Sequence, residues 1–241
     1  MIKVLHLRDT EKLCGPGKTI LETASRIDQS RFKLSVGLFL RSHEDSNYYR
    51  EILESRGIEV IPIVAKSQFS IEMMKTLVRI IRDNNFDIVH AHDYKTDILT
   101  TLISRSIKIP TMTTAHGWIT NTTKSKIYTF AGKNCFRFFD KVIAVSPKIH
   151  KTISNFGVRT DRLELIYNAI VAENYVRDDY TPGYLRKRFD IPAHYKIIGN
   201  VGRISPEKGQ KDFVRAAAKL LQRREDLAFI LIGNGPDTEE V

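Results

Sequence analysis

Short apolar runs and amphipathic segments alternate along the chain. The runs have the length and the Val, Ile and Leu content of buried strands, and the segments between them have apolar residues at helical spacing. We expect strands at residues 2–7, 34–40, 58–64, 88–91, 111–114, 141–145 and 163–167. We expect helices at 19–27, 48–55, 71–83, 97–106, 126–139 and 148–155. This alternation predicts an α/β fold, a Rossmann-like doubly wound parallel sheet with its ligand site at the carboxyl ends of the strands.

The alternation is interrupted between residues 169 and 195. This segment is polar and rich in turn-forming residues, namely Asp178, Asp179, Pro182, Gly183 and Pro192. Its composition predicts an interdomain hinge between a first domain at 1–168 and the start of a second domain at 196–241. The second domain has strands at 197–201 and 228–232 and a helix at 210–223. One such unit cannot bury both faces of a sheet, so we expect this domain to be incomplete, through a fragmentary sequence or a natural truncation.

The chain carries a net charge of +10 at pH 7, which favours an anionic partner such as nucleic acid, phospholipid or a phosphorylated substrate. No recognition-helix, RNP or zinc signature accompanies the charge, so we expect no nucleic-acid partner. The densest basic stretch, 124–151, interleaves lysine and arginine with aromatic residues. It is either a solvated helix whose aromatic residues face the core or a basic amphipathic surface that contacts anionic lipid.

Several features predict a cytoplasmic protein. No apolar run reaches the ~20 residues that span a bilayer, and the N-terminal run becomes charged at Arg8 and Asp9, unlike a signal peptide. Cys14 and Cys135 match no metal or redox spacing, which favours reduced thiols. Contact with lipid through the basic stretch would place the protein peripherally at the inner membrane face.

The first glycine-rich segment lies between the first predicted strand and the first predicted helix. Gly15 and Gly17 either let backbone N–H groups approach a phosphate at the helix N-terminus or form a plain tight turn. A P-loop needs glycine at position 12, where the chain has Lys12. The dinucleotide fingerprint needs glycine at position 20, where it has Ile20.

Histidines mark the ends of two predicted strands. His90 and His92 lie on one face of the fourth strand, whereas Asp93 lies on the other face or in the loop. Two histidines can bind a metal, but no third ligand has a recognisable spacing. We therefore expect structural or substrate-facing roles for His92 and Asp93, and no metal. His116 follows the fifth strand, either at the ligand-bearing edge or hydrogen-bonded within the loop.

The second domain carries two cations in the turn between its first strand and its helix. Arg203 offers a planar fork for phosphate, and Lys208 offers a mobile point charge. Both precede a helix N-terminus, which itself attracts anions. The alternative is a charged turn with a solvated lysine.

Together, the order and spacing of these motifs resemble those of family-4 glycosyltransferases, in the glycosyl transferases group 1 superfamily, whose GT-B fold has two Rossmann-like domains. The resemblance covers essentially the whole chain. Its segments are the loop at 15–17, DIVHAHD at 87–93, TAHG at 114–117, FDKVIAVS at 139–146, LIYNAI at 165–170, VGRISPEKG at 201–209 and LIGNGP at 231–236.

This resemblance implies transfer of a sugar from a nucleotide-diphosphate donor to an acceptor hydroxyl with retention of configuration. It implies a role in cell-surface polysaccharide or glycolipid synthesis, an acceptor that is lipid-linked or a small molecule, and no cofactor or metal. Arg203 and Lys208 match the pair that binds the donor diphosphate, and Gly15 and Gly17 would contact the donor's phosphates and sugar. His116 matches the catalytic-site histidine that contacts the donor sugar.

Three departures from the family pattern remain. Asn168 matches the asparagine that opens the hinge, but Ala169 follows it in place of glycine. The first loop reads Gly-Pro-Gly-Lys where the family often has Gly-Gly-Ala-Glu. The family's Glu-x7-Glu segment would lie beyond Val241. We therefore expect the chain to be inactive alone, and the alternative is a non-catalytic truncated or split subunit that binds acceptor or a partner polypeptide.

Overall fold

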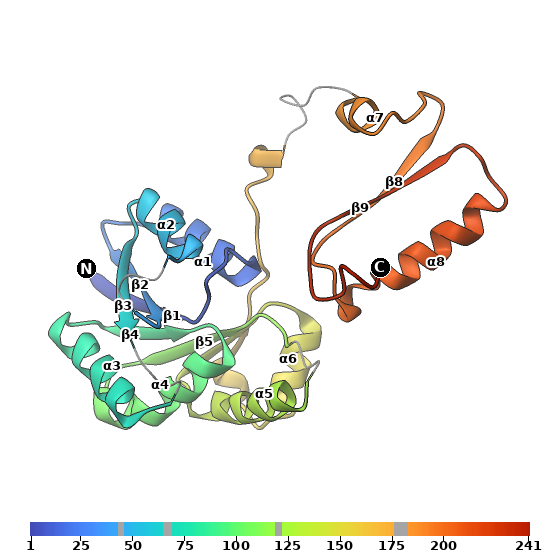
Figure 1. The fold of residues 1–241 in the computed structure, drawn as a ribbon. Helices are drawn as coiled ribbons and strands as arrows, with labels where there is room; N and C mark the ends of the chain where they lie inside the picture. Colours follow the sequence, from blue (N-terminus) through green and yellow to red (C-terminus); the bar gives the residue numbers. More distant parts are fainter. Residues whose placement is uncertain (43–45, 65–68, 119–121, 176–182) are drawn as a thin grey trace. The chain divides into compact units, whose positions relative to one another are not determined.

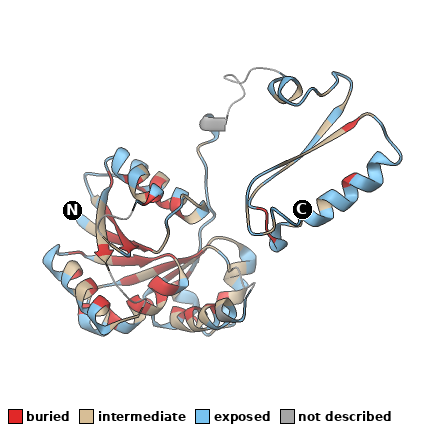
Figure 2. Cartoon of the chain, viewed as in Figure 1, coloured by how far each residue is buried: buried red, intermediate tan, exposed pale blue. Residues whose placement is uncertain are grey.

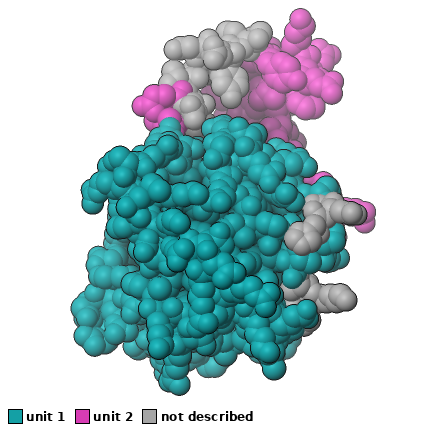
Figure 3. Space-filling view, turned by 90° about the vertical axis from the view of Figure 1, so that its left-hand side faces the viewer, with its two compact units in different colours: residues 1–170 teal, residues 171–241 magenta. Residues whose placement is uncertain are grey.

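The computed structural model describes residues 1–42, 46–64, 69–118, 122–175 and 183–241. The chain forms two compact units, Met1–Ile170 and Val171–Val241, which Figure 3 colours teal and magenta. Each unit has its own parallel sheet, with seven strands in the first unit and two in the second among the described residues.

The sheet of the first unit has the strand order β3-β2-β1-β4-β5-β6-β7 (Figure 1). Its strands are β1 (Ile2–Arg8), β2 (Phe32–Leu40), β3 (Glu59–Val64), β4 (Ile88–Ala91), β5 (Thr111–Ala115), β6 (Lys141–Ala144) and β7 (Leu163–Leu165). All neighbouring pairs are parallel. The order reverses between β1 and β4, and open α/β sheets bind ligands at such a switch point. The predicted doubly wound α/β fold is confirmed.

Helices cover both faces of this sheet (Figure 1). The helices α1 (Gly15–Arg26) and α2 (Tyr48–Ser55) bury Ile20, Leu21 and Leu53 on one side. On the other side, α3 (Ile71–Asp83) and α4 (Tyr94–Ile107) form a second core, and α6 (Pro147–Ser154) buries Ile153 against β6 and β7. Figure 2 shows the buried residues along the strands and on the inner sides of the helices. This double coverage produces a rigid strand edge on which a site can be built.

The largest differences from the predicted bounds lie at the ends of helices. Helix α1 begins at Gly15, four residues before the predicted start, so the glycine segment is its first turn rather than a free turn. Pro16 lies in that first turn, where its missing N–H removes no helical hydrogen bond. Helix α4 begins three residues early because Asp93 and Thr96 form a capping box.

The basic stretch agrees only in part with the interpretation that its aromatic residues face the core. Helix α5 (Thr123–Cys135) ends early, and a 3₁₀ turn at Phe136–Phe138 replaces its predicted last turn. Phe136 and Phe139 are buried, but Phe130 and Phe138 are exposed, so the aromatic residues divide between core and surface. The side chain of Lys124 lies outside the described residues.

In the second unit, a small sheet is packed on one helix. It contains α7 (Tyr184–Arg188), β8 (Lys196–Val201), α8 (Gln210–Leu221) and β9 (Leu227–Ile232), with β8 and β9 parallel. Val201 is 77% exposed and Ile232 is 44% exposed, and few residues of this unit are buried (Figure 2). The predicted hinge at 169–195 includes a 3₁₀ turn at Ala172–Tyr175 and α7. Its Asp178, Asp179 and Pro182 lie outside the described residues.

In the part of the chain that the structure describes, no helix is both long enough and apolar enough to cross a membrane.

Candidate functional site

Polar side chains gather at the switch point of the large sheet. Arg8 ends β1, His92 follows β4, and His116 follows β5. The Arg8 Nη1 group donates to the His92 carbonyl oxygen at 3.0 Å, and His92 Nδ1 lies 3.3 Å from His116 Nε2. The structure therefore brings His92 and His116 together, as expected of residues at the carboxyl ends of adjacent parallel strands.

Asp93 is engaged within the protein. One carboxylate oxygen accepts from the Thr96 backbone N–H at 3.0 Å and caps α4. The other oxygen accepts from Arg8 at 3.3 Å and from the Asp9 backbone N–H at 3.0 Å. Burial raises the pKa of Asp93, although Arg8 and these N–H groups oppose the shift. Its main role is to hold Arg8 against the start of α4, and Lys95 bonds Asp9 beside it at 3.1 Å.

The start of α1 joins this group through Cys14. Arg8 Nη2 lies 3.1 Å from Cys14 Sγ. Burial opposes ionisation of the thiol, but the Arg8 charge and a hydrogen bond from the Gly17 backbone lower the pKa of Cys14 overall. Gly17 packs so closely on Tyr49 that an added Cβ would lie 3.0 Å from the ring, whereas Gly15 faces open space. The structure thus gives Gly17 a packing role and leaves Gly15 open to a ligand.

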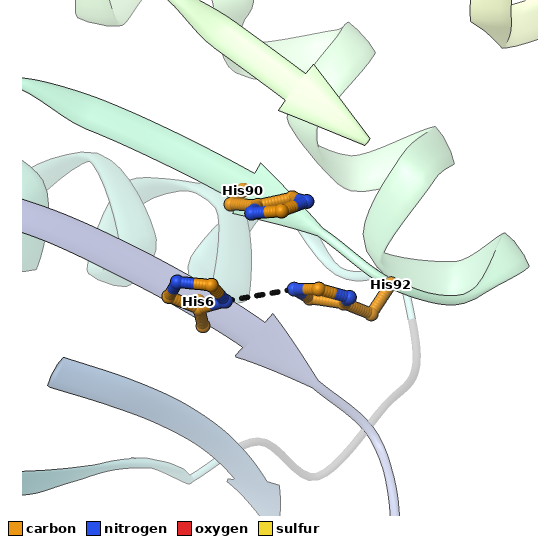
Figure 4. Close-up of side chains that lie close together, drawn as sticks. All are labelled: His6, His90 and His92. Carbon is orange, nitrogen blue, oxygen red and sulfur yellow. Dashed lines mark hydrogen bonds between the residues drawn. The ribbon is translucent and has the colours of Figure 1, made fainter. Parts of the chain in front are cut away.

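Three buried histidines, His6, His90 and His92, and the half-buried His116 form a cluster behind this edge. His6 Nδ1 lies 2.8 Å from His92 Nε2 (Figure 4), and the His90 and His92 ring centroids are 4.1 Å apart. Burial lowers the pKa of His6 to about 4. Burial, together with the Arg8 charge, lowers the pKa of His116 to about 4. Burial and neighbouring charge also hold the pKa values of His90 and His92 well below the ordinary value. At neutral pH all four rings are uncharged.

Three of these histidines offer nitrogens within 4.8 Å of one another, the spacing of a metal site: His6, His90 and His92. A metal must lie in the plane of each ring that binds it, however, and His6 and His92 point one nitrogen of each ring at the other instead. The 2.8 Å between His6 Nδ1 and His92 Nε2 is shorter than the ~3.3 Å that separates two nitrogens on tetrahedral zinc. His90 Nε2 already bonds the Thr114 hydroxyl at 2.8 Å. The geometry favours hydrogen bonding over metal binding.

The sequence interpretation missed three residues of this site: His6, Arg8 and Cys14. His6 pairs with His90 across β1 and β4, a contact that follows from strand order and not from local pattern. A charged residue at the carboxyl end of the first strand was the available signal for Arg8. No local signal distinguishes Cys14 from a thiol that only fills space.

Arg203 and Lys208 lie in the second unit, in the connection between β8 and α8. Lys208 ends a 3₁₀ turn at Pro206–Lys208, and Gly209 with φ 70° leads into α8. The Gln210 side chain holds the loop, because it donates to the Arg203 carbonyl oxygen at 2.9 Å and accepts from the Ser205 N–H at 3.3 Å. Both cationic side chains are exposed. The loop is therefore ordered by hydrogen bonds between the Gln210 side chain and the loop backbone, with its two cationic side chains in water.

The remaining features are a cavity in the second unit and the predicted hinge residue Asn168. A cavity of about 230 Å³ in the second unit is lined by Ser205, Gln210, Arg215 and their neighbours, and not by Arg203 or Lys208. Asn168 is exposed in the segment after β7, near the end of the first unit.

Comparison with solved structures supports the fold. Anabaena HepE in complex with UDP-glucose superposes with a TM-score of 0.78 at 22% identity, over 100% of this chain and 63% of that one. The lipopolysaccharide outer core galactosyltransferase WaaB in its apo form gives a TM-score of 0.66 at 14% identity, over 100% and 63%. The architecture is therefore of the GT-B type.

Sequence relatives are also glycosyltransferases by name. UDP-Gal:alpha-D-GlcNAc-diphosphoundecaprenol alpha-1,3-galactosyltransferase of Escherichia coli is 22% identical over 245 residues, 97% of this chain and 62% of that protein. The 2-deoxystreptamine N-acetyl-D-glucosaminyltransferase of Niallia circulans is 27% identical over 178 residues, 66% of this chain and 43% of that protein. The chain thus spans less than two thirds of the length of these relatives.

Two known families match successive segments of the chain. Residues 184–241 match Glycosyl transferases group 1. Residues 15–174, which include Gly15, the histidines at 90, 92 and 116, and Asn168, match Glycosyltransferase Family 4. With most of its length matched and the fold in agreement, this chain belongs to Glycosyltransferase Family 4.

Proposed function

We propose that this protein transfers a sugar from a nucleotide-diphosphate sugar to an acceptor hydroxyl, with retention of configuration at the anomeric carbon. The observation that carries the proposal is the pair Arg203 and Lys208, exposed on an ordered loop at the start of α8. A nucleotide sugar is consistent with the relatives, since HepE was solved with UDP-glucose and the E. coli relative is named for UDP-Gal. No metal or other cofactor enters the proposal.

In this proposal Arg203 and Lys208 stabilise the donor diphosphate. The Arg203 guanidinium suits bidentate contact with phosphate oxygens, and Lys208 adds a mobile positive charge. The N-terminus of the 12-residue helix α8 adds a favourable dipole. Charge on the departing diphosphate increases in the transition state, so these groups would lower the barrier as well as bind the donor.

His116 would contact the sugar as a neutral hydrogen-bonding group. A base with a pKa of about 4 is poorly matched to proton abstraction at neutral pH. An uncharged imidazole can still bind a sugar hydroxyl and orient the donor. Gly15, which faces open space at the start of α1, would allow the donor phosphates to approach the backbone.

The donor proposal is tested by UDP binding to the purified chain, measured by calorimetry. We expect Arg203→Ala and Lys208→Ala each to weaken binding about tenfold or more, which corresponds to at least ~1.4 kcal/mol. Lys219→Ala, which removes an exposed cation from the last turn of α8, is the matched control and should bind as the wild type does. Equal affinity in all four proteins would contradict the diphosphate role. No measurable UDP binding by the wild type would favour the alternative, a non-catalytic subunit that binds acceptor or a partner polypeptide.

We propose a lipid-linked saccharide as acceptor, in cell-surface polysaccharide or glycolipid synthesis at the cytoplasmic face of the inner membrane. The E. coli relative is named for a diphosphoundecaprenol acceptor. The described part of α5 and the turn after it adds a specific observation. Ile127 and Phe130 are exposed on α5, and Phe138 is exposed in the 3₁₀ turn after it. Lys126 and Arg137, beside them in the sequence, are also exposed. Apolar side chains beside cations suit an anionic lipid surface.

Membrane contact is tested by flotation with vesicles of phosphatidylcholine alone or with phosphatidylglycerol. We expect binding only to the anionic vesicles, and we expect Phe130→Glu to reduce it several-fold by placing a negative charge among the exposed apolar side chains. Leu102→Glu, at an exposed leucine of α4, is the control and should float with the vesicles as the wild type does. Equal loss in both variants would contradict a surface centred on α5.

A further inference from the structure

Three imidazoles form a continuous hydrogen-bonded chain from β1 to the loop after β5. His6 Nδ1 lies 2.8 Å from His92 Nε2 (Figure 4), and His92 Nδ1 lies 3.3 Å from His116 Nε2. The His90 ring lies against that of His92, with a centroid distance of 4.1 Å and an interplanar angle of 31°, but His90 Nε2 bonds the Thr114 hydroxyl. His90 is therefore part of the cluster without being part of this chain.

The protons on these three rings are coupled. A neutral imidazole has one N–H donor and one lone pair. His92 is bonded at both nitrogens, so it donates to one neighbour and accepts from the other. Two arrangements satisfy both bonds. In one, every N–H points toward His116, which then carries its own proton on Nδ1. In the other, every N–H points toward His6, and His116 Nδ1 is a bare lone pair.

The two arrangements differ in whether His116 Nδ1 carries a proton. Among the described residues, His116 Nδ1 is one of three buried side-chain nitrogen or oxygen atoms without a hydrogen-bond partner, and His6 Nε2 is not. The first arrangement would leave a buried, unpaired N–H at His116, near the positive charge of Arg8. The second leaves a lone pair, which that charge stabilises. An unpaired buried donor is the costlier defect, so the second arrangement is favoured.

We propose that His92 and His6 are positioning residues that hold His116 in the Nε2-protonated tautomer, and that its bare Nδ1, which is covered in this structure, accepts a hydrogen bond from a substrate hydroxyl once substrate binding uncovers it. The identity of this hydroxyl as one of a sugar rests on the proposed function, but the tautomer does not. An acceptor-only nitrogen binds a hydroxyl and has no bond to offer an ether or a deoxy position. The imidazole chain thereby contributes to substrate selection.

The tautomer can be measured without any substrate. In the full chain labelled with ¹⁵N-histidine, long-range ¹H–¹⁵N spectra at pH 7.5 distinguish a protonated from a bare ring nitrogen, and His116→Gln identifies the His116 signals. We expect the wild type to show His116 protonated at Nε2 alone. His92→Phe removes both bonds and keeps an aromatic ring, and we expect it to give a mixture of His116 tautomers. His6→Phe removes only the terminal acceptor and should also give a mixture.

His90→Phe is the matched control, because His90 is a buried histidine of the same cluster that takes no part in the hydrogen bonds linking His6, His92 and His116. We expect it to leave the His116 tautomer unchanged. A wild-type His116 protonated at Nδ1, or present as a mixture, would overturn the proposal even if the variants failed to fold. So would an unchanged tautomer in both His92→Phe and His6→Phe, or one Zn²⁺ bound per chain and lost in His6→Phe. A correct tautomer without UDP binding would count against the proposed function alone.

Discussion

At the scale of single residues, the switch point combines ionisable groups that burial keeps uncharged with charges that are paired. His6, His90 and His92 are buried, and their pKa values are lowered. Arg8 is also buried, but it bonds Asp93, Cys14 and the His92 carbonyl oxygen. A buried unpaired charge is expensive, whereas a neutral ring with hydrogen-bond partners is tolerated. The site is therefore stable near neutral pH and sensitive to acid.

We predict that the first unit loses stability as the pH falls from about 7 toward 4. His6 and His116 have pKa values of about 4 in the folded protein, below the ~6.5 of an unfolded chain. The unfolded state therefore binds more protons in this window, and each histidine should cost roughly 2 kcal/mol at pH 5. The free energy of unfolding at each pH is measured by urea unfolding, followed by the fluorescence of Trp118, the single tryptophan. His6→Phe should flatten the dependence and His194→Gln, at an exposed site, should not. The same slope in wild type and His6→Phe would contradict this origin.

The opposite pH dependence is expected from Asp97. Burial raises the pKa of this carboxyl well above its ordinary value, although a 2.6 Å hydrogen bond from Thr113 opposes the shift. Above the ordinary pKa of an aspartate, the folded state still holds a proton on Asp97 that the unfolded state has lost. The free energy of unfolding therefore falls as the pH rises from the ordinary pKa toward the raised pKa of the folded protein. We predict that Asp97→Asn is more stable relative to wild type at pH 8 than at pH 5.5, by the same Trp118 measurement. Asp83→Asn, at an exposed site, is the control. A gain that is equal at both pH values would show that Asp97 is charged in the folded protein.

At the scale of elements, two loops of the second unit are joined by backbone contacts that require glycine. The Gly202 N–H donates to the Ile232 carbonyl oxygen at 2.9 Å, and the Ile204 N–H donates to that of Asn234 at 3.2 Å. An added Cβ at Gly233 would lie 1.8 Å from the Gly202 oxygen, and one at Gly235 would lie 1.9 Å from the Ile204 oxygen. The loop that carries Arg203 is thus held by the loop after β9.

We predict that Gly235→Ala separates these two loops. Because the Cβ would overlap backbone atoms, which cannot rotate away as a side chain can, the Ile204 amide should lose protection against hydrogen exchange by at least tenfold. UDP binding should weaken with it, since Arg203 loses its fixed position. Gly199→Ala is the control in the same unit, where the nearest atom would be 3.9 Å away. Unchanged exchange at Ile204 in Gly235→Ala would show that the loops are not coupled.

At the scale of the whole molecule, the two units differ in how completely their sheets are covered. The first unit has helices on both faces of seven strands, whereas β8 and β9 keep exposed apolar side chains such as Val201 and Ile232. Parallel sheets are normally buried on both faces. Few buried contacts imply a low free energy of local unfolding. The second unit should therefore open more readily than the first.

We predict that limited trypsin digestion of the purified chain removes residues beyond about 170 and leaves a resistant core. The core should contain Trp118 and give the same unfolding midpoint as the uncut chain. Saturating UDP should slow the digestion of the second unit, because a ligand that binds only the folded state stabilises it. Mass spectrometry of the time course measures both effects. Uniform resistance through β9 without ligand would contradict the difference between the units.

Local pattern determined the elements of this protein, and tertiary structure determined its site. Helices α2 and α3 and strand β4 have the predicted bounds, because apolar spacing and the capping side chains of Asn47 and Ser70 act over a few residues. The α/β class and the positions of His92, His116, Arg203 and Lys208 at strand ends followed in the same way.

Pairing between distant segments determined the rest. Strand β1 lies beside β4 in the sheet. This pairing brings His6 to His92, which are 86 residues apart in the sequence, and Arg8 to Asp93, which are 85 residues apart. The sequence showed single histidines and no chain of imidazoles. Hydrogen bonds and desolvation act only over a few ångströms. Tautomers and pKa values therefore depend on which strands are neighbours, and only the folded sheet decides that.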